Sequence, residues 1–391
     1  MIRIRRIGRL PWLVVNSTVA LPLGCVAAMA WANLAPEPYY RFSHAVDFVV
    51  NNIGLALFLG VMTKQVVEET LRGGVLHSWR SALLPIVAAI GGILVPIPIY
   101  FWFLDYVAEP MLVSAWAVTS AIDVGLCFLI GRVVFGRHPA VPVLVLISMV
   151  ANAIGLAIIA AMDPPSTPYW VVGCVVVATC AGMAIWLRRR RVRSFWPYLL
   201  GPGVLCWAGL YLAGVHPALA LVPVVPFMPH ARRDPGLHEE SPATDHTTLS
   251  RFERAFGPSI QPVLFLFGLV NAGVPLHGIE PGMWALPVAT LIGRPIGVFA
   301  GAIIAARIGL RPTVRIGLRE LVVIGIIAST GLTMALFFTS AVMATGSLQQ
   351  QMRVGALLTS VGAPLGVAMA WVLGVGRFHH RRRTVQAEAT L

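Results

Sequence analysis

Residues 115–162 read AWAVTSAIDVGLCFLIGRVVFGRHPAVPVLVLISMVANAIGLAIIAAM, which is two apolar segments joined by a short basic turn. The first segment carries a carboxylate, Asp123, with apolar residues on both sides. An ionisable group is costly to bury at membrane depth, so Asp123 predicts a functional site. The neighbouring Thr119, Ser120 and Gly125 are poor choices for a helix interior. They predict a helix that breaks in mid-membrane and leaves backbone groups facing a cavity. The alternative is an aspartate that pairs structurally with another helix.

The composition of the chain is typical of a membrane protein. Of its 391 residues, 57% are hydrophobic and 12% are charged, and the mean hydropathy is +0.80. Soluble domains carry about 25% charged residues, so the sequence predicts an all-α polytopic membrane protein. The five cysteines lie in apolar segments without metal-ligand spacing, and we interpret them as small apolar residues. We expect no metal site and no cofactor.

Candidate membrane spans follow from the length of the apolar segments, because a spanning helix needs about 20 mostly apolar residues. Twelve segments come near this length: 11–34, 45–66, 81–104, 115–135, 140–162, 169–187, 196–213, 215–229, 260–277, 282–306, 320–345 and 352–376. The short pair 196–213 and 215–229 is alternatively one tilted helix with a re-entrant piece. That alternative would give eleven spans and place the termini on opposite sides.

The basic residues decide between these topologies. With twelve spans and a cytoplasmic N-terminus, 26 of the 29 Lys and Arg residues fall in inner segments, leaving only Arg41, Arg294 and Arg353 elsewhere. Since Lys and Arg are retained on the cytoplasmic side, we expect twelve membrane spans with both termini cytoplasmic. The net charge of +13 is thus explained by the basic residues on the cytoplasmic side, which also favour binding to anionic lipids. We therefore expect no nucleic-acid binding.

A polar linker at 230–259 divides the chain in sequence order. It follows an eight-span part, 1–229, and precedes a four-span part with a basic tail, 260–391. Each part holds a trio of helices, 81–162 and 282–376. The sequence has no phosphate-binding loop, nucleophile elbow or paired-carboxylate motif, so we expect neither an ATP-driven pump nor an enzyme.

A second interrupted segment lies in the second trio. Residues 320–345 carry Ser329, Thr330, Gly331 and Thr333 in mid-span. A pair of interrupted spans at matching places in two halves predicts a transporter binding site between inverted repeats. The alternative is that these small residues mediate close helix packing.

Arg294 is the other charge at membrane depth, in the segment LIGRPIGVFAG. At the bilayer centre an arginine costs ~3 kcal/mol on insertion scales, so it needs either a counter-charge or the carbonyls of a helix C-terminus. Asp123 is the expected partner.

These segments resemble the NhaA family of bacterial sodium/proton antiporters. The matching strings are SWRSALLPIVAAIGGILVP (78–96), AWAVTSAIDVG (115–125), NAIGLAIIA (152–160), GVHPALA (214–220), FGLVNAGVPLHGI (267–279), GRPIGV (293–298) and GIIASTGLTMALF (325–337). The resemblance implies twelve helices with inverted repeats and two broken helices that cross in mid-membrane. It also implies that the ion site lies at this crossing.

The chain departs from the family at the residues that carry its chemistry. Two adjacent aspartates of the family are replaced by Asn152 and Ala153, the Thr-Asp of the broken helix is Ile122-Asp123, and the buried lysine is Arg294. Arginine keeps the charge but does not deprotonate in a useful range.

Two functions remain open. The first is an antiporter that exchanges sodium or lithium for protons, contributes to pH and sodium homeostasis, acts as a homodimer, and uses Asp123, Asn152, Thr119 and Ser120 at its ion site. The alternative is a degenerate homologue that has lost or altered its ion coupling, and that moves another solute or acts as a regulatory or scaffold membrane protein.

Overall fold

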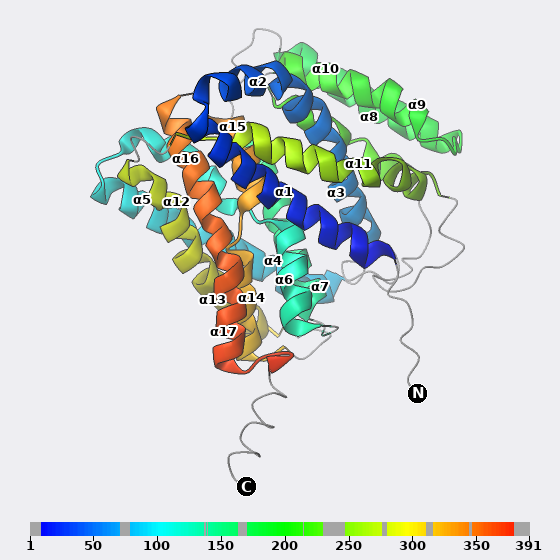
Figure 1. Cartoon of the computed structure of the whole chain (residues 1–391). Helices are drawn as coiled ribbons and strands as arrows, with labels where there is room; N and C mark the ends of the chain where they lie inside the picture. Colours follow the sequence, from blue (N-terminus) through cyan, green and yellow to red (C-terminus); the bar gives the residue numbers. More distant parts are fainter. Residues whose placement is uncertain are drawn as a thin grey trace, which may run out of the picture. The chain divides into compact units, whose positions relative to one another are not determined.

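The structure is a computed structural model. It describes residues 9–70, 79–136, 138, 140–162, 170–213, 215–229, 247–275, 280–309, 316–343 and 346–378. These residues form helices and connecting turns and no strand (Figure 1). Most of the predicted linker, residues 230–246, and most of the basic tail lie outside the described residues.

The chain forms two compact units, and each is built from two separate stretches. Unit 1 is Met1–His77 with Ala160–Gly273, and unit 2 is Ser78–Ile159 with Val274–Leu391. Both predicted trios, 81–162 and 282–376, contribute nearly all of their residues to unit 2. The predicted division into parts before and after the linker at 230–259 follows the order of the sequence and not these units, and it stays a prediction.

The described elements of unit 1 come from both of its stretches. In the element labels, η marks a 3-10 or π-helical segment. They are α1 (Arg9–Leu34), α2 (Pro36–Phe48), η1 (Val49–Gly54), α3 (Leu55–Thr70), α8 (Trp170–Arg189), α9 (Trp196–Tyr198), η3 (Leu199–Gly203), α10 (Val204–Ala213), η4 (Pro217–Leu221), η5 (Val225–Phe227) and α11 (Thr248–Asn271). Helices α1 and α11 pack so closely that a Cβ on Gly24 would lie 2.2 Å from the carbonyl oxygen of Phe265. Small residues allow such backbone approach between membrane helices.

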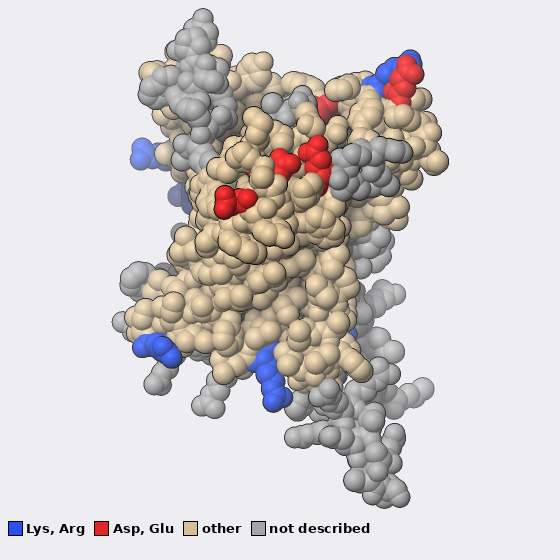
Figure 2. All heavy atoms as spheres, turned by 90° about the vertical axis from the view of Figure 1, so that its left-hand side faces the viewer, with Lys and Arg blue, Asp and Glu red and all other residues tan. Residues whose placement is uncertain are grey.

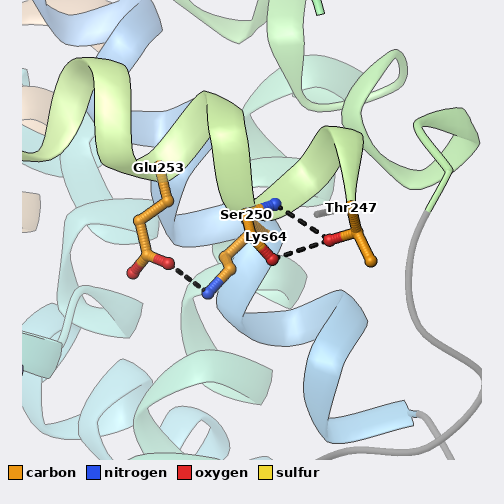
Figure 3. Close-up of polar contacts among 4 residues, drawn as sticks. All are labelled: Lys64, Thr247, Ser250 and Glu253. Carbon is orange, nitrogen blue, oxygen red and sulfur yellow. Dashed lines mark hydrogen bonds and ion pairs between the residues drawn. The ribbon is translucent and has the colours of Figure 1, made fainter. Parts of the chain in front are cut away.

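Polar contacts tie α3 and the segment before it to α11. The amides of Asn51 and Asn271 donate to each other at 3.2 and 2.7 Å. Further along the same helices, the Lys64 ammonium lies 2.6 Å from a carboxylate oxygen of Glu253, and Thr247 caps the start of α11 by accepting from the Ser250 amide (Figure 3). Lys64 is one of the 26 basic residues that the topology places in inner segments, and its side chain is buried in this interhelical ion pair.

Unit 2 holds the two interrupted segments. Its elements are α4 (Trp79–Leu94), α5 (Pro96–Tyr106), η2 (Pro110–Ser120), α6 (Val124–Phe135), most of α7 (Ala140–Met162), η6 (Pro281–Trp284), α12 (Ala285–Val288), η7 (Ala289–Gly293), α13 (Arg294–Arg307), α14 (Leu318–Ala328), α15 (Leu332–Val342), α16 (Ser347–Leu358), η8 (Thr359–Val361) and α17 (Gly362–Leu373). The pair η2 and α6 bends by 54° at its break, and the pair α14 and α15 bends by 47°. Both predicted breaks are therefore present.

A glycine seam fixes α13, which carries Arg294, against α4. A Cβ at Gly297 would lie 2.1 Å from the carbonyl oxygen of Gly91, and one at Gly301 would lie 2.5 Å from that of Val87. Such contacts exclude any side chain from these positions. Arg294, at the start of this tightly packed helix, is fully buried.

The helices have the length and apolar character of membrane spans. Among the described residues, six helices are long and apolar enough to cross a membrane. Counting each of the two bent pairs as one span raises this number to eight. Several expected spans are divided into shorter pieces, such as 196–213 into α9, η3 and α10, so the count of twelve stays a prediction. On the face where α5, α12, α13 and α16 lie, an uncharged band runs across the middle, and all the acidic side chains in view lie above it (Figure 2).

Candidate functional site

The two breaks of unit 2 meet and hydrogen-bond to each other. The first break is Ala121–Asp123, between η2 and α6, and the second is Ser329–Gly331, between α14 and α15. The Asp123 backbone N–H donates to the Thr330 carbonyl oxygen at 2.8 Å. Two interrupted helices thus share one crossing, as the family resemblance implies.

Asp123 lies where two helices begin. Its Oδ1 accepts from the Leu126 N–H at 2.9 Å, which caps α6. Its Oδ2 accepts from the Thr333 N–H at 3.0 Å and from the Thr333 hydroxyl, in the first turn of α15. Helix N-termini attract negative charge, so the fold places this carboxylate at the positive ends of two half-helices.

Arg294 lies where the two preceding helices end. Its guanidinium donates to the carbonyl oxygens of Ala121 and Ala328, both at 2.9 Å, and to that of Thr119. Thr119 lies in the last turn of η2, Ala121 follows its last residue, and Ala328 is the last residue of α14. Helix C-termini attract positive charge and leave carbonyls without partners in their own helix. The arginine supplies both the charge and the donors.

The expected pairing of Arg294 with Asp123 is therefore wrong. In the part of the chain that the structure describes, no ion pair within 4.0 Å joins the two side chains. Each charge is matched to a pair of helix ends instead, and carbonyls at helix C-termini are the other partner that the sequence allowed for Arg294. A guanidinium satisfies several carbonyls because its donors spread in a fixed fork.

The Asn152 amide hydrogen-bonds to the backbone of Ile122 and not to the Asp123 carboxylate. Its Oδ1 accepts from the Ile122 N–H at 2.9 Å, and its Nδ2 donates to the Ile122 carbonyl oxygen at 2.7 Å. The amide thus binds both backbone groups of the middle residue of the first break. Neighbouring Ala153 offers no polar group.

The other predicted site residues divide into those that contact Asp123 and those whose side chains do not. Thr330 and Thr333 contact Asp123, the first through its carbonyl and the second through its N–H and hydroxyl. Gly331 lies at the second break. The hydroxyls of Thr119, Ser120 and Ser329 each donate to the carbonyl three residues earlier in their own helix, and Gly125 lies inside the first turn of α6.

Sequence reasoning missed Thr359. Its Oγ1 accepts from the Gly331 N–H at 3.2 Å and donates to the Ala356 carbonyl at 2.6 Å. Thr359 lies in the third helix of the second trio, as Asn152 lies in the third helix of the first. That correspondence is the signal that could have identified it.

The crossing has the chemistry of a site for a small hard cation. A carboxylate, a hydroxyl and backbone carbonyls are oxygen donors, which sodium-like cations favour. Among the described residues no group of three His, Cys, Asp or Glu could hold a metal ion. The site thus offers one acid, Asp123, with neutral oxygens around it.

Comparison with known proteins agrees with this geometry. Residues 15–372 match the family described as Na+/H+ antiporter 1. The chain belongs to this family. It is 39% identical over 373 residues to the Na(+)/H(+) antiporter NhaA of Desulfitobacterium hafniense (strain DSM 10664 / DCB-2), covering 92% of this chain and 94% of the relative. It is 36% identical over 372 residues to Na(+)/H(+) antiporter NhaA 1 of Pelobacter propionicus, covering 92% and 97%.

A solved structure shows the same fold at low identity. The sodium proton antiporter MjNhaP1 from Methanocaldococcus jannaschii matches with a TM-score of 0.60 at 14% identity, covering 94% of this chain and 97% of that chain. Membership of the Na+/H+ antiporter 1 family and an all-α, multi-pass membrane fold are thus confirmed. The family consists of transporters.

Proposed function

We propose that this member of the Na+/H+ antiporter 1 family exchanges sodium or lithium for protons, with Asp123 as its coupling group. One observation carries the proposal. Among the residues whose side chains the structure describes, Asp123 is the single buried acid, and it lies at the crossing of the two broken helices. A buried ionisable group facing the interior of a membrane protein marks an ion or proton pathway.

Exchange requires that a cation and a proton compete for one group. An ionised Asp123 offers carboxylate oxygens to the cation, and the Thr333 hydroxyl beside it offers another oxygen. Protonation of Asp123 removes the negative charge and expels the cation. Arg294 stays charged throughout, because a guanidinium does not release its proton in the working range. One titrating group therefore predicts one proton exchanged for each monovalent cation.

We place the protein in a bacterial inner membrane, as a homodimer with both termini cytoplasmic, serving pH and sodium homeostasis. The distribution of basic residues over the predicted inner segments supports the orientation. The relatives named above, which are bacterial Na(+)/H(+) antiporters, support the compartment and the role.

A second function is favoured by the hydrogen bonds at the crossing. The Asp123 carboxylate already accepts three hydrogen bonds, and the Asn152 amide is engaged with Ile122. Both groups therefore already stabilise the fold. A homologue that keeps the scaffold but has lost ion coupling would need the same contacts.

Transport in proteoliposomes separates the two functions. The purified protein is reconstituted with an imposed pH gradient and a trapped pH dye, and sodium or lithium is added. We expect dissipation of the gradient by wild type, loss of that response in Asp123→Asn, and a retained response in Asp105→Asn, which changes an exposed aspartate of α5. We also expect that an imposed membrane potential leaves the rate unchanged, because one proton for one cation moves no net charge.

The result that contradicts exchange is equally clear. A silent wild type, together with activity in the double variant Asn152→Asp, Ala153→Asp, would show an intact scaffold without its coupling acid. Activity that persists in a folded Asp123→Asn protein would exclude Asp123 as the coupling group.

A further inference from the structure

The third helix of each trio contacts the break of the second helix in the same way. In the first trio, Asn152 of α7 binds the backbone of Ile122. In the second, Thr359 at the join of α16 and α17 binds the backbone of Gly331. Ile122 and Gly331 lie at the first and second breaks respectively.

A glycine lies three residues after each of these polar side chains. A Cβ at Gly155 would lie 2.3 Å from Ser120 Oγ, and one at Gly362 would lie 2.9 Å from Thr330 Oγ1. One helical turn beyond the polar contact, each helix thus leaves room for the neighbouring break. The sequences NAIG (152–155) and TSVG (359–362) share the pattern of a polar residue followed by glycine at the fourth position.

We propose that these two four-residue elements are matched positioning elements, and that Asn152 and Thr359 are positioning residues of the exchange site. They act through the backbone of the breaks. Asn152 fixes Ile122 and so the position of the adjoining Asp123 carboxylate. Thr359 fixes Gly331, which lies two residues before Thr333, a hydrogen-bond partner of that carboxylate.

Burial makes these contacts necessary. Ile122, Asn152 and Thr359 are all buried, so no water replaces a lost partner. An unpaired backbone group costs several times more in such a place than at a wet surface. Asn152 supplies both a donor and an acceptor to one residue, whereas Thr359 supplies one acceptor. Asn152 is therefore the stronger element.

Hydrogen–deuterium exchange of the full-length protein tests the proposal without reference to transport. Peptides that contain Ile122 and Gly331 report on the two breaks. In Asn152→Ala we expect about tenfold faster exchange of the Ile122 peptide, and in Thr359→Val about threefold faster exchange of the Gly331 peptide. The Thr359→Ser variant keeps the hydroxyl and should exchange like wild type.

Matched controls come from buried hydroxyls of the same two trios. Ser148 of α7 and Thr339 of α15 are buried, and each hydroxyl donates to the carbonyl four residues earlier in its own helix. Ser148→Ala and Thr339→Val should leave both peptides unchanged. If Asn152→Ala does not fold, Asn152→Asp takes its place. An ionised carboxylate keeps the acceptor for the Ile122 N–H but loses the donor to its carbonyl, so exchange should still rise.

A transport measurement tests the link to Asp123, and this arm alone rests on the proposed cation/proton exchange. Thr359→Val should raise the half-saturation concentration for sodium severalfold and shift the pH profile, and Thr359→Ser should restore both. Unchanged exchange at Ile122 and Gly331, or an equal rise in the controls, would overturn the positioning elements. Faster exchange together with a silent wild type would instead refute only the proposed transport.

Discussion

The two breaks of unit 2 share one crossing but differ in backbone conformation. At the first break, Ala121 and Asp123 are extended, with ψ of 127° and 104°. At the second, Ser329 and Gly331 stay close to a helical turn, with ψ of −7° and 3°. The Ser329 and Thr330 N–H groups each donate to a carbonyl three residues earlier, whereas both backbone groups of Ile122 are bound by Asn152.

This difference teaches that a broken helix can satisfy its backbone in two ways. The tight break pairs two of its N–H groups within its own helix and takes one side chain from outside, Thr359 at Gly331, whereas the extended break depends on side chains from other helices. The first break obtains them from Asn152 and from Arg294, which also binds the end of α14. It also carries the charge, Asp123. The more demanding break is thus the one that holds the proposed coupling group.

The largest effect is expected at Arg294, which binds the helix ends that lead into both breaks. Arg294→Met leaves three carbonyls at two helix ends without this donor and should lower the free energy of unfolding by about 3–5 kcal/mol. Arg294→Lys keeps the charge with fewer well-placed donors and should fall in between. Unfolding measured by steric trapping in bicelles checks this. A stable Arg294→Met protein would mean that the helix ends do not need the charge.

A smaller loss is expected for Asp123→Ala. It removes the caps of α6 and α15 together and should cost about 2–3 kcal/mol in the same assay. Thr333→Val removes only the hydroxyl partner and should cost about 1 kcal/mol. If the two variants lost equal stability, the caps that Asp123 provides to α6 and α15 would add nothing to the stability of the fold.

Alanine substitutions at Gly155 and Gly362 compare how tightly the third helices pack against the two breaks. Gly155→Ala would bring a Cβ to 2.3 Å from Ser120 Oγ and 2.7 Å from Phe338, whereas in Gly362→Ala the nearest atom lies at 2.9 Å. We expect a loss of about 1–3 kcal/mol for Gly155→Ala and less for Gly362→Ala. The midpoint temperatures of unfolding of the two variants show which one loses more stability. A larger loss in Gly362→Ala would show that the first break accommodates the added methyl group more easily than the second.

The smallest effects are expected at Ser120 and Ser329, whose hydroxyls donate within their own helices. Ser120→Ala and Ser329→Ala should each change stability by about 0.5 kcal/mol or less and leave the half-saturation concentration for sodium unchanged. A higher half-saturation concentration in Ser120→Ala alone would place that hydroxyl in the ion site.

Much of the site could be predicted because its signals are local. Asp123 and Arg294 stand out as charges in apolar segments, and small polar residues mark both breaks. Hydrogen-bond partners are not local. Asp123 bonds to Thr333, and Asn152 to Ile122, across long separations in sequence. The sequence offers no signal for whether an arginine prefers a carboxylate or a helix end.

The sequence by itself determined that this chain is an all-α membrane protein with two interrupted helices, because hydropathy and helix-breaking residues act within one segment. Only the tertiary structure decided that Asp123 lies at two helix N-termini and Arg294 at two C-termini. It also decided that Asn152 and Thr359 bind the breaks. These pairings depend on which helix ends meet in space, and in an apolar interior each unpaired backbone group must find its partner wherever the fold places one.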